Sequence, residues 1–173
     1  MTKYQLAKLV AWAGTFHTRK RVQKSIHLLQ AAGCPFRVEH RLHHYGPYSY
    51  EVADLTDELT REGVFQETNT PTAVGRQYNY ALSEAARRTL EAFERTPGGA
   101  RAERELQPFE PLFRRLLSCD LRELELASTI MYYKQHGLDW SQAAEATARF
   151  KCESAGGPVM ERAAALAQSL VSG

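Results

Sequence analysis

The sequence has little cysteine and no long hydrophobic run. Its three cysteines, Cys34, Cys119 and Cys152, are odd in number and widely spaced, so they do not indicate a disulfide framework. Apolar stretches are short and interrupted by charge, far from the roughly 20 apolar residues that a membrane span requires. The beginning of the chain lacks the basic and apolar regions of a secretory signal peptide. We therefore expect a reduced, cytoplasmic protein without a membrane partner.

The motifs of the common enzyme classes are also missing. There is no Gly-x-Ser-x-Gly elbow, no phosphate-binding loop, no dinucleotide fingerprint and no His-Glu-x-x-His. The cysteines do not lie where a thiolate is activated: Cys34 precedes Pro35 and Cys119 precedes an acid, Asp120. Cys152 follows Lys151 but is expected late in a helix, where the helix dipole disfavours a thiolate. The sequence therefore predicts a non-catalytic protein that binds no cofactor.

Charge is present in near balance overall but is distributed unevenly. The 173 residues carry a formal net charge of +2, with 43% hydrophobic and 24% charged residues, as in an ordinary globular protein. Residues 1–47 contain eight Lys or Arg, one acid and five of the six histidines, whereas residues 48–62 contain five acids and one Arg. This asymmetry indicates an interaction surface in the first third of the chain, although a solvated helix face explains many charge runs.

The first part of the chain has the element order of a winged-helix domain. Apolar spacing and capping residues predict helices over 2–13, 18–33, 49–63 and 83–95, and an extended segment over 34–45 that ends in a Gly46-Pro47 turn. Strand-like runs over 64–68 and 76–82 are joined by the turn-rich segment 69–75, which resembles a wing. We therefore predict a winged-helix domain over residues 1–96, ending in a linker at Thr96–Gly99.

The remainder of the chain is predicted to be helical. Pro111, Asp120, Asp139 and Pro158 each occupy a position typical of a helix start. We expect a helical bundle over residues 97–173 that packs on the winged-helix domain, so the fold class is mainly α with a small β-wing. The apolar stripe between Val159 and Leu170 fits burial in the monomer and a homodimer interface equally well.

One local pattern resembles a known family. His44-Tyr45-Gly46-Pro47-Tyr48-Ser49, preceded by the helix segment Arg19-Lys-Arg-Val-Gln-Lys24, is similar to the aromatic-Gly-Pro-Tyr-Ser turn and basic helix of the YwgA-like family. The segment Glu123–Thr129 and Lys151 also resemble the tail of that family, so the resemblance covers most of the chain. The family is functionally uncharacterised and implies no particular chemistry.

A more remote resemblance implies a protein partner. A helix followed by Tyr-Gly-Pro is similar to the Panacea domain of certain bacterial antitoxins and proteolytic adaptors, which act by gripping another protein. Tyr48-Ser49 stands here where Panacea members often carry an aliphatic residue.

Two kinds of macromolecular partner fit these patterns. In most winged-helix domains the helix before the wing enters the major groove, but here its expected solvent face carries Tyr50, Asp54 and Asp57, and acids repel phosphates. DNA contact would therefore use basic residues elsewhere, namely Arg19, Lys20, Lys24, Arg37 and Arg41. We predict instead a regulatory interaction module that binds a protein partner, with double-stranded DNA as the alternative.

The protein-binding hypothesis assigns two groups of contact residues. The apolar spacing of the second helix places its basic side chains on the opposite side, facing solvent. Tyr45 is expected to pack the Gly46-Pro47 turn onto the core. A basic face beside an acidic one orients a partner of matching charge, and tyrosine is frequent at binding hot spots. The predicted groups are Arg19, Lys20, Lys24 and His27 on one face, and Tyr48, Tyr50, Asp54 and Asp57 on the other.

A metal site is a minor alternative. His40, His43 and His44 are close in sequence, and Cys34 and His17 can fold nearby. Zinc sites need three or four converging ligands, usually with a recognisable spacing, and His-x-x-His-His in an extended segment matches that requirement poorly.

Overall fold

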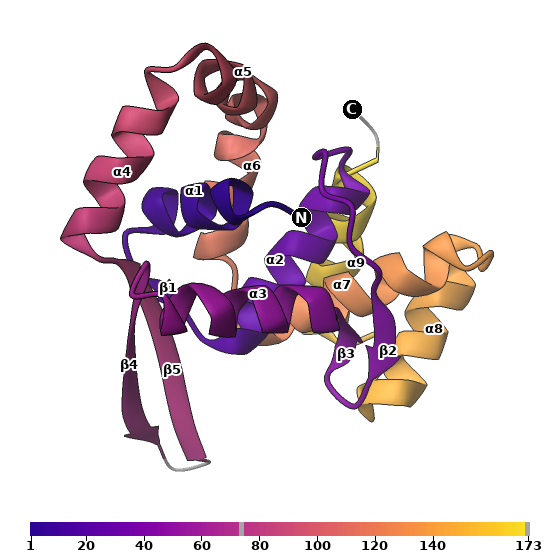
Figure 1. The fold of residues 1–173 in the computed structure, drawn as a ribbon. Helices are drawn as coiled ribbons and strands as arrows, with labels where there is room; N and C mark the ends of the chain where they lie inside the picture. Colours follow the sequence, from indigo (N-terminus) through magenta and orange to yellow (C-terminus); the bar gives the residue numbers. More distant parts are fainter. Residues whose placement is uncertain (73–74, 172–173) are drawn as a thin grey trace.

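The computed structural model describes residues 1–72 and 75–171, which form a mostly helical protein with a three-stranded antiparallel sheet and a separate two-stranded one (Figure 1). In chain order the elements are α1 (Lys3–Ala13), β1 (Phe16–His17), α2 (Arg19–Ala31), β2 (Arg41–His43), β3 (Gly46–Tyr48), α3 (Tyr50–Arg61), β4 (Phe65–Thr72), β5 (Gly75–Leu82), α4 (Glu84–Glu94), α5 (Pro97–Leu106), the 3₁₀ turn η1 (Gln107–Phe109), α6 (Glu110–Ser118), α7 (Leu121–Gln135), α8 (Trp140–Lys151) and α9 (Pro158–Ser169).

Side-chain caps fix the beginnings of these helices close to their predicted positions. The side chain of Thr2 accepts a hydrogen bond from the Gln5 amide and that of Ser49 accepts one from the Val52 amide. Asp139 forms a reciprocal capping box with Gln142 at the start of α8. Each cap satisfies an amide that the helix itself leaves unpaired, which is why the sequence located these ends well.

The three-stranded sheet has the order β1-β5-β4, and its hairpin projects away from the helices (Figure 1). Phe65 pairs with Leu82 at the buried end of the hairpin, whereas residues 68–72 of β4 are solvent-exposed. The strands extend further than predicted, because β4 continues to Thr72 and β5 begins at Gly75, through most of the segment expected to be a wing loop. Pro71 is compatible with this ribbon, since an exposed outer strand need not donate every amide. The remaining wing residues, 73–74, lie outside the described part of the chain.

The short hairpin of β2 and β3 also differs from its prediction. Gly46 and Pro47 begin β3 and pair with His43 and Leu42. The chain therefore reverses at His44 and Tyr45, two residues before the predicted turn. Gly46 has φ +87°, a conformation that glycine adopts without strain. The Gly46-Pro47 pattern therefore correctly predicted a turn, but it placed that turn too far along the chain.

Helix α2 lies at the centre of the molecule. Its residues 22–29 are all buried, because α6, α7 and the β2–β3 hairpin pack around it. Arg21 donates hydrogen bonds to the carbonyl oxygens of Leu116, Leu117 and Cys119 at the end of α6, at 3.2, 3.2 and 2.9 Å. One hydrophobic core consequently includes residues from both parts of the chain.

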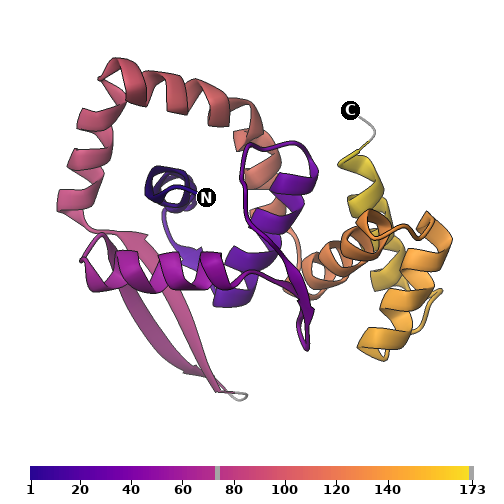
Figure 2. The same cartoon turned by 45° about the vertical axis from the view of Figure 1, so that its right-hand side comes forward.

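The helices after residue 83 pack around the first part of the chain. Helices α4, α5 and α6 curve around α1 (Figure 2). The predicted linker Thr96–Gly99 is the cap and first turn of α5, and a Cβ at Gly99 would overlap the carbonyl oxygen of Phe93, so this corner is tight. Helix α9 buries its apolar stripe against α7 within the chain. None of the described helices combines the length and apolar character needed to cross a membrane.

Candidate functional site

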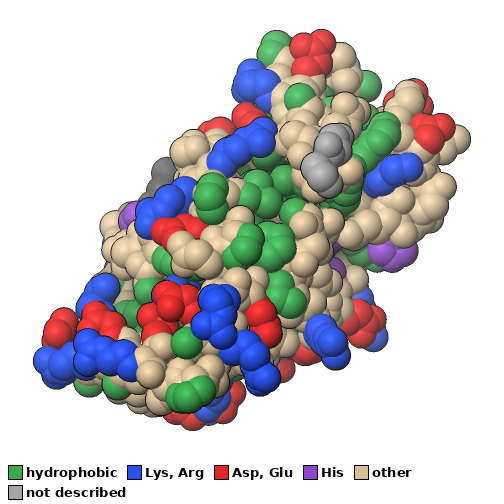
Figure 3. Space-filling model, turned by 90° about the horizontal axis from the view of Figure 1, so that it is seen from above, with side chains coloured by type: hydrophobic (Ala, Val, Ile, Leu, Met, Phe, Trp, Pro, Cys, Tyr) green, Lys and Arg blue, Asp and Glu red, His purple; other side chains and the backbone are tan. Residues whose placement is uncertain are grey.

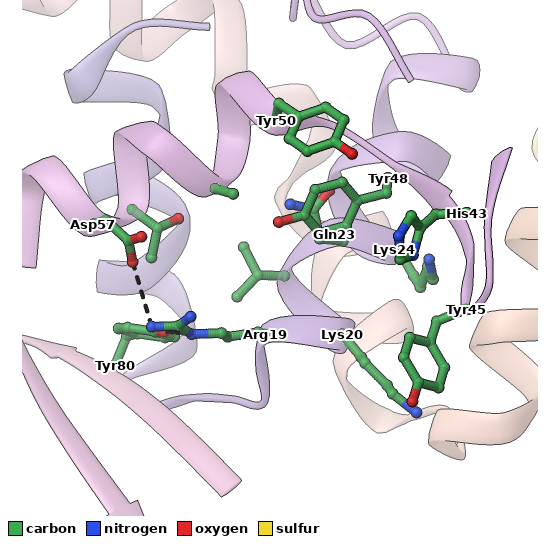
Figure 4. A pocket seen from close by; sticks show the side chains of 13 residues that line it. Arg19, Lys20, Gln23, Lys24, His43, Tyr45, Tyr48, Tyr50, Asp57 and Tyr80 are labelled. Carbon is green, nitrogen blue, oxygen red and sulfur yellow. Dashed lines mark hydrogen bonds and ion pairs between the residues drawn. The ribbon is translucent and has the colours of Figure 1, made fainter. Parts of the chain in front are cut away.

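A cavity of about 390 Å³ opens between α2, α3, β5 and the β2–β3 hairpin (Figure 4). It joins two groups that the sequence analysis placed on separate faces, because the basic residues of α2 and the tyrosines after the Gly-Pro turn line the same space. The lining residues are Arg19, Lys20, Val22, Gln23, Lys24, His43, Tyr45, Tyr48, Tyr50, Ala53, Thr56, Asp57 and Tyr80.

The prediction of an exposed basic face on α2 is wrong for two of its residues. Lys24 and His27 are buried, with 1% and 2% of their surface exposed, because α7 covers the side of α2 that was expected to face water. His27 makes hydrogen bonds with Ser128 and Gln135 of α7. The side of α2 opposite its apolar stripe is therefore a second packing surface.

The other predicted contact residues divide into those that reach the cavity and those that do not. Arg37, Arg41 and Asp54 are exposed but do not line it, and Arg41 pairs with Glu39 at 2.9 Å within its own segment. Tyr45 does not pack onto the core as expected, since 57% of its surface is exposed and its ring lies 4.1 Å from the Lys20 ammonium.

Side chains of α2 hold the hairpin in place. Gln23 forms two hydrogen bonds with the backbone of Ser49, donating to its carbonyl oxygen at 3.0 Å and accepting from its amide at 2.8 Å. Lys24 donates to the carbonyl oxygen of Pro47 at 2.6 Å. From the other side, Lys151 of α8 donates to the His44 carbonyl oxygen at 3.4 Å. The two parts of the motif that resembles the YwgA-like family, the basic helix and the Gly-Pro-Tyr-Ser segment, are thus attached to each other by hydrogen bonds.

Gly46 is the point where the hairpin touches α7. A Cβ on this residue would lie 2.5 Å from Thr129 Oγ1, closer than real side chains approach, and 3.6 and 3.7 Å from the Nζ atoms of Lys24 and Lys151. The hairpin therefore requires glycine here for both its backbone conformation and its close approach. The resemblance had marked the segment Glu123–Thr129, but nothing in the sequence indicated that Thr129 would contact Gly46, which is far away along the chain.

The hairpin end of the cavity has an excess of positive charge. Burial, together with the nearby ammonium groups of Lys151 and Lys20, lowers the pKa of Lys24 to about 7, and Glu125 partly opposes this effect. Glu125 is only 4% exposed and pairs with Lys20 at 3.1 Å and with Arg122 at 3.3 Å. One carboxylate therefore serves several cations.

The opposite end of the cavity is occupied by an ion-paired arginine. Arg19 donates to the Tyr80 hydroxyl at 2.7 Å and pairs with Asp57 at 3.3 Å and Glu67 at 3.2 Å (Figure 4). Its guanidinium also lies over the Tyr78 ring. Sequence reasoning missed Tyr80 because β5 joins this site only through the sheet.

The three histidines considered for a metal site do not converge on one point. The His40 ring packs against that of His27 at 4.7 Å, whereas His43 packs against Tyr48 at 5.6 Å and is exposed, like His44. Across residues 1–72 and 75–171, no three His, Cys, Asp or Glu residues converge in a way that could hold a metal ion. The three histidines do not form the site considered for them.

The chain is similar to a known bacterial protein. The chain is 29% identical to "Uncharacterized protein YwgA" of Bacillus subtilis over 129 residues, which are 75% of this chain and 72% of the relative. No model of a known protein family matches the chain. The resemblance to the YwgA-like family is thereby confirmed, and the relative's name assigns no activity.

We expect Gly46→Ala to lower the free energy of unfolding by about 2–4 kcal/mol, because it adds overpacking against Thr129 to the cost of a positive φ. Gly63→Ala is the matched control. Gly63 has φ +71° and no atom within 4 Å of its Cβ position, so only the backbone cost of about 1–2 kcal/mol applies. Urea denaturation of both variants measures the difference, and equal losses would contradict the proposed close contact.

A second prediction concerns the pH dependence of stability. Burial and the Lys24 ammonium lower the pKa of His40 from 6.5 to about 4. A histidine with a lowered native pKa stabilises the fold above pH 6.5, and this contribution is lost as the pH falls towards 4, because the unfolded chain takes up the proton first. Each unit of difference between the pKa in the native and unfolded states corresponds to about 1.4 kcal/mol in the free energy of unfolding.

His40→Leu should therefore reduce the loss of stability between pH 6.5 and 4, as measured by urea denaturation at a series of pH values. Some pH dependence should remain, because burial also lowers the pKa of His27. The control is His43→Leu at an exposed position, where the wild-type slope is expected. A His40→Leu slope identical to the wild type would refute this assignment.

Proposed function

We propose that this protein is a non-enzymatic regulatory interaction module of winged-helix type that binds a protein partner through the cavity between α2, α3 and the hairpin. The observation that carries the proposal is the preformed cavity with exposed tyrosines at its rim. Tyr50 is 60% exposed and packs edge-on against Tyr48 at 5.2 Å, and Tyr45 stands at the hairpin tip. Tyrosines beside a pocket are frequent anchors for a partner.

The winged-helix assignment is supported by element order and strand pairing. Helix α1, strand β1, helices α2 and α3, and strands β4 and β5 follow one another, and β1 adds to the β4–β5 hairpin in the order β1-β5-β4. The β2–β3 hairpin is an addition between α2 and α3. This addition forms one wall of the cavity, so the feature that departs from a minimal winged helix is also part of the proposed binding site.

The charge distribution favours a protein partner over DNA. The exposed face of α3 carries acids, including Asp54 and Asp57, which would repel phosphates if this helix entered a groove. Two cations of α2 that line the cavity are already paired, Arg19 with Asp57 and Glu67, and Lys20 with Glu125. Figure 3 shows the face of the molecule away from the β4–β5 hairpin, where Lys and Arg side chains are mixed with Asp and Glu.

DNA binding remains the second candidate because the β4–β5 hairpin has the form of a wing. It projects from the body, and Arg76 on its outer part is exposed. A wing of this kind can contact the phosphate backbone without help from α3.

We expect Tyr50→Ala to weaken binding of the partner at least tenfold, because a buried tyrosine anchor contributes about 2 kcal/mol or more. Wild-type and variant proteins would be immobilised, exposed to a lysate of the source organism, and compared by quantitative mass spectrometry. Binding would then be measured with the purified partner. The control is Phe93→Ala, which removes another exposed aromatic side chain away from the cavity. A Tyr50→Ala variant that retains the same partners as the wild type would refute the proposed surface.

For DNA, the paired cations lead us to expect no salt-dependent binding. Fluorescence anisotropy with a duplex of ~30 base pairs, at about 50 and 200 mM salt, tests this directly because phosphate contacts weaken steeply over that range. Micromolar binding at low salt that disappears at high salt, and that is reduced by Arg76→Gln or by Lys20→Gln, would favour the DNA alternative.

A further inference from the structure

We infer that the cavity recognises an apolar ring or side chain that carries a carboxylate, with the ring against the tyrosine wall and the carboxylate at the hairpin end beside Lys20. Where this group belongs to a partner's side chains, the inference rests on the proposed function. Where it belongs to a free small molecule, the inference stands without that function.

The middle of the cavity suits an apolar group. Val22 and Ala53 contribute aliphatic surface from α2 and α3, and Tyr48, Tyr50 and Tyr80 contribute aromatic surface. A volume of about 390 Å³ is within the range of small-ligand sites, which are mostly apolar with a few polar groups that fix orientation. Burial of an aromatic ring against such walls is favourable, and pairs of rings prefer the edge-on or offset contacts that the tyrosines can provide.

Two hydroxyl groups in this wall are available to a ligand. Figure 4 shows the Tyr48 ring projecting from the hairpin into the space between α2 and α3, with Tyr50 next to it. Within residues 1–72 and 75–171, the contacts found for these two side chains are ring contacts, and neither hydroxyl has a hydrogen-bond partner. A polar atom on the ligand can therefore be bound in place of water, without breaking a hydrogen bond between the described residues.

The hairpin end is suited to an anion because its cations outnumber its carboxylates. The amines of Lys24 and Lys151 converge on Gly46, and Lys20 adds a third ammonium group. Among the described residues, Glu125 is the carboxylate that opposes the repulsion at both Lys24 and Lys151, and it is shared with Lys20. A bound carboxylate would reduce this repulsion.

At the hairpin end of the cavity, Lys20 is more accessible to a ligand than Lys24 is. Its side chain is 42% exposed at the cavity mouth, while Lys24 is buried behind it. His43 and Tyr45 line the same end (Figure 4). At the other end, Asp57 beside Arg19 disfavours an anion, so the charges give the ligand a single orientation.

The test is a ¹H–¹⁵N NMR titration of the full chain with two probes, 3-phenylpropionate and its uncharged amide, 3-phenylpropanamide. We expect both probes to shift the amide signals of residues 19–24, 46 and 48–53. The carboxylate should bind about fivefold more tightly, the gain expected for a partly exposed ion pair. Absence of shifts in these segments at millimolar probe, or equal affinities of the two probes, would overturn the inference.

Three variants separate the two parts of the site. Ala53→Trp fills the cavity and should weaken both probes at least tenfold, whereas Lys20→Met should remove only the preference for the carboxylate. The control is Ala85→Trp, which places the same ring in a second groove between α1 and α4 and should leave both affinities unchanged. Unchanged binding by a folded Ala53→Trp variant would overturn the inference. If that variant does not fold, the comparison of wild type with Lys20→Met still decides whether the carboxylate is recognised.

Peptide probes distinguish the two sources of the ligand. An acetylated Asp-Phe-Asp amide is compared with its Asn-Phe-Asn counterpart in the same titration. Preference for the acidic peptide, together with displacement of a captured partner by 3-phenylpropionate, supports a partner's side chains as the ligand. Binding of 3-phenylpropionate but of neither peptide supports a small aromatic acid. That result retains this inference and rejects the proposed function.

Discussion

The attachment of the β2–β3 hairpin to α2 is the interaction on which the candidate site depends. Gln23 and Lys24 are buried polar residues in the middle of the core, and each is directed at the backbone of the segment Pro47–Ser49. A buried amide or amine is costly unless it is hydrogen-bonded, so these side chains specify one position for the hairpin. Gly46 completes the attachment by allowing the hairpin to lie directly against Thr129 of α7.

The cavity follows from this attachment. The hairpin is held against α2 and α7, and Tyr48 at its end and Tyr50 at the start of α3 line the cavity. The same contacts bring Lys20, Lys24 and Lys151 together beside a single buried glutamate. The shape of the cavity and the charge at its hairpin end therefore both depend on the attachment of the hairpin, and a substitution at Gly46 should disturb both.

The sequence predicted the elements better than it predicted their surroundings. Thr2, Ser49 and Asp139 act locally, through hydrogen bonds to amides two or three residues away, and their helices begin where expected. Lys24 and His27 were assigned to solvent because helical periodicity reports only the spacing of polar residues. It contains no information about α7, which lies about a hundred residues further along the chain and covers them. Tyr80 and Lys151 joined the site in the same way, through tertiary contacts.

A buried lysine at position 24 requires an explanation, because an uncharged residue would avoid the free-energy cost of removing an ammonium group from water. Its hydrogen bond to Pro47 compensates only in part, and Lys20 and Lys151 increase the penalty through repulsion. The amines of Lys24 and Lys151 hold the hairpin through hydrogen bonds to Pro47 and His44, although replacing buried charges with apolar residues is often neutral or stabilising. The anion proposed above would offset the repulsion among the three amines and, by binding the folded state, would stabilise it. Binding and hairpin order should therefore be coupled, and that coupling would allow a small or peptidic acid to regulate the surface that carries the tyrosines.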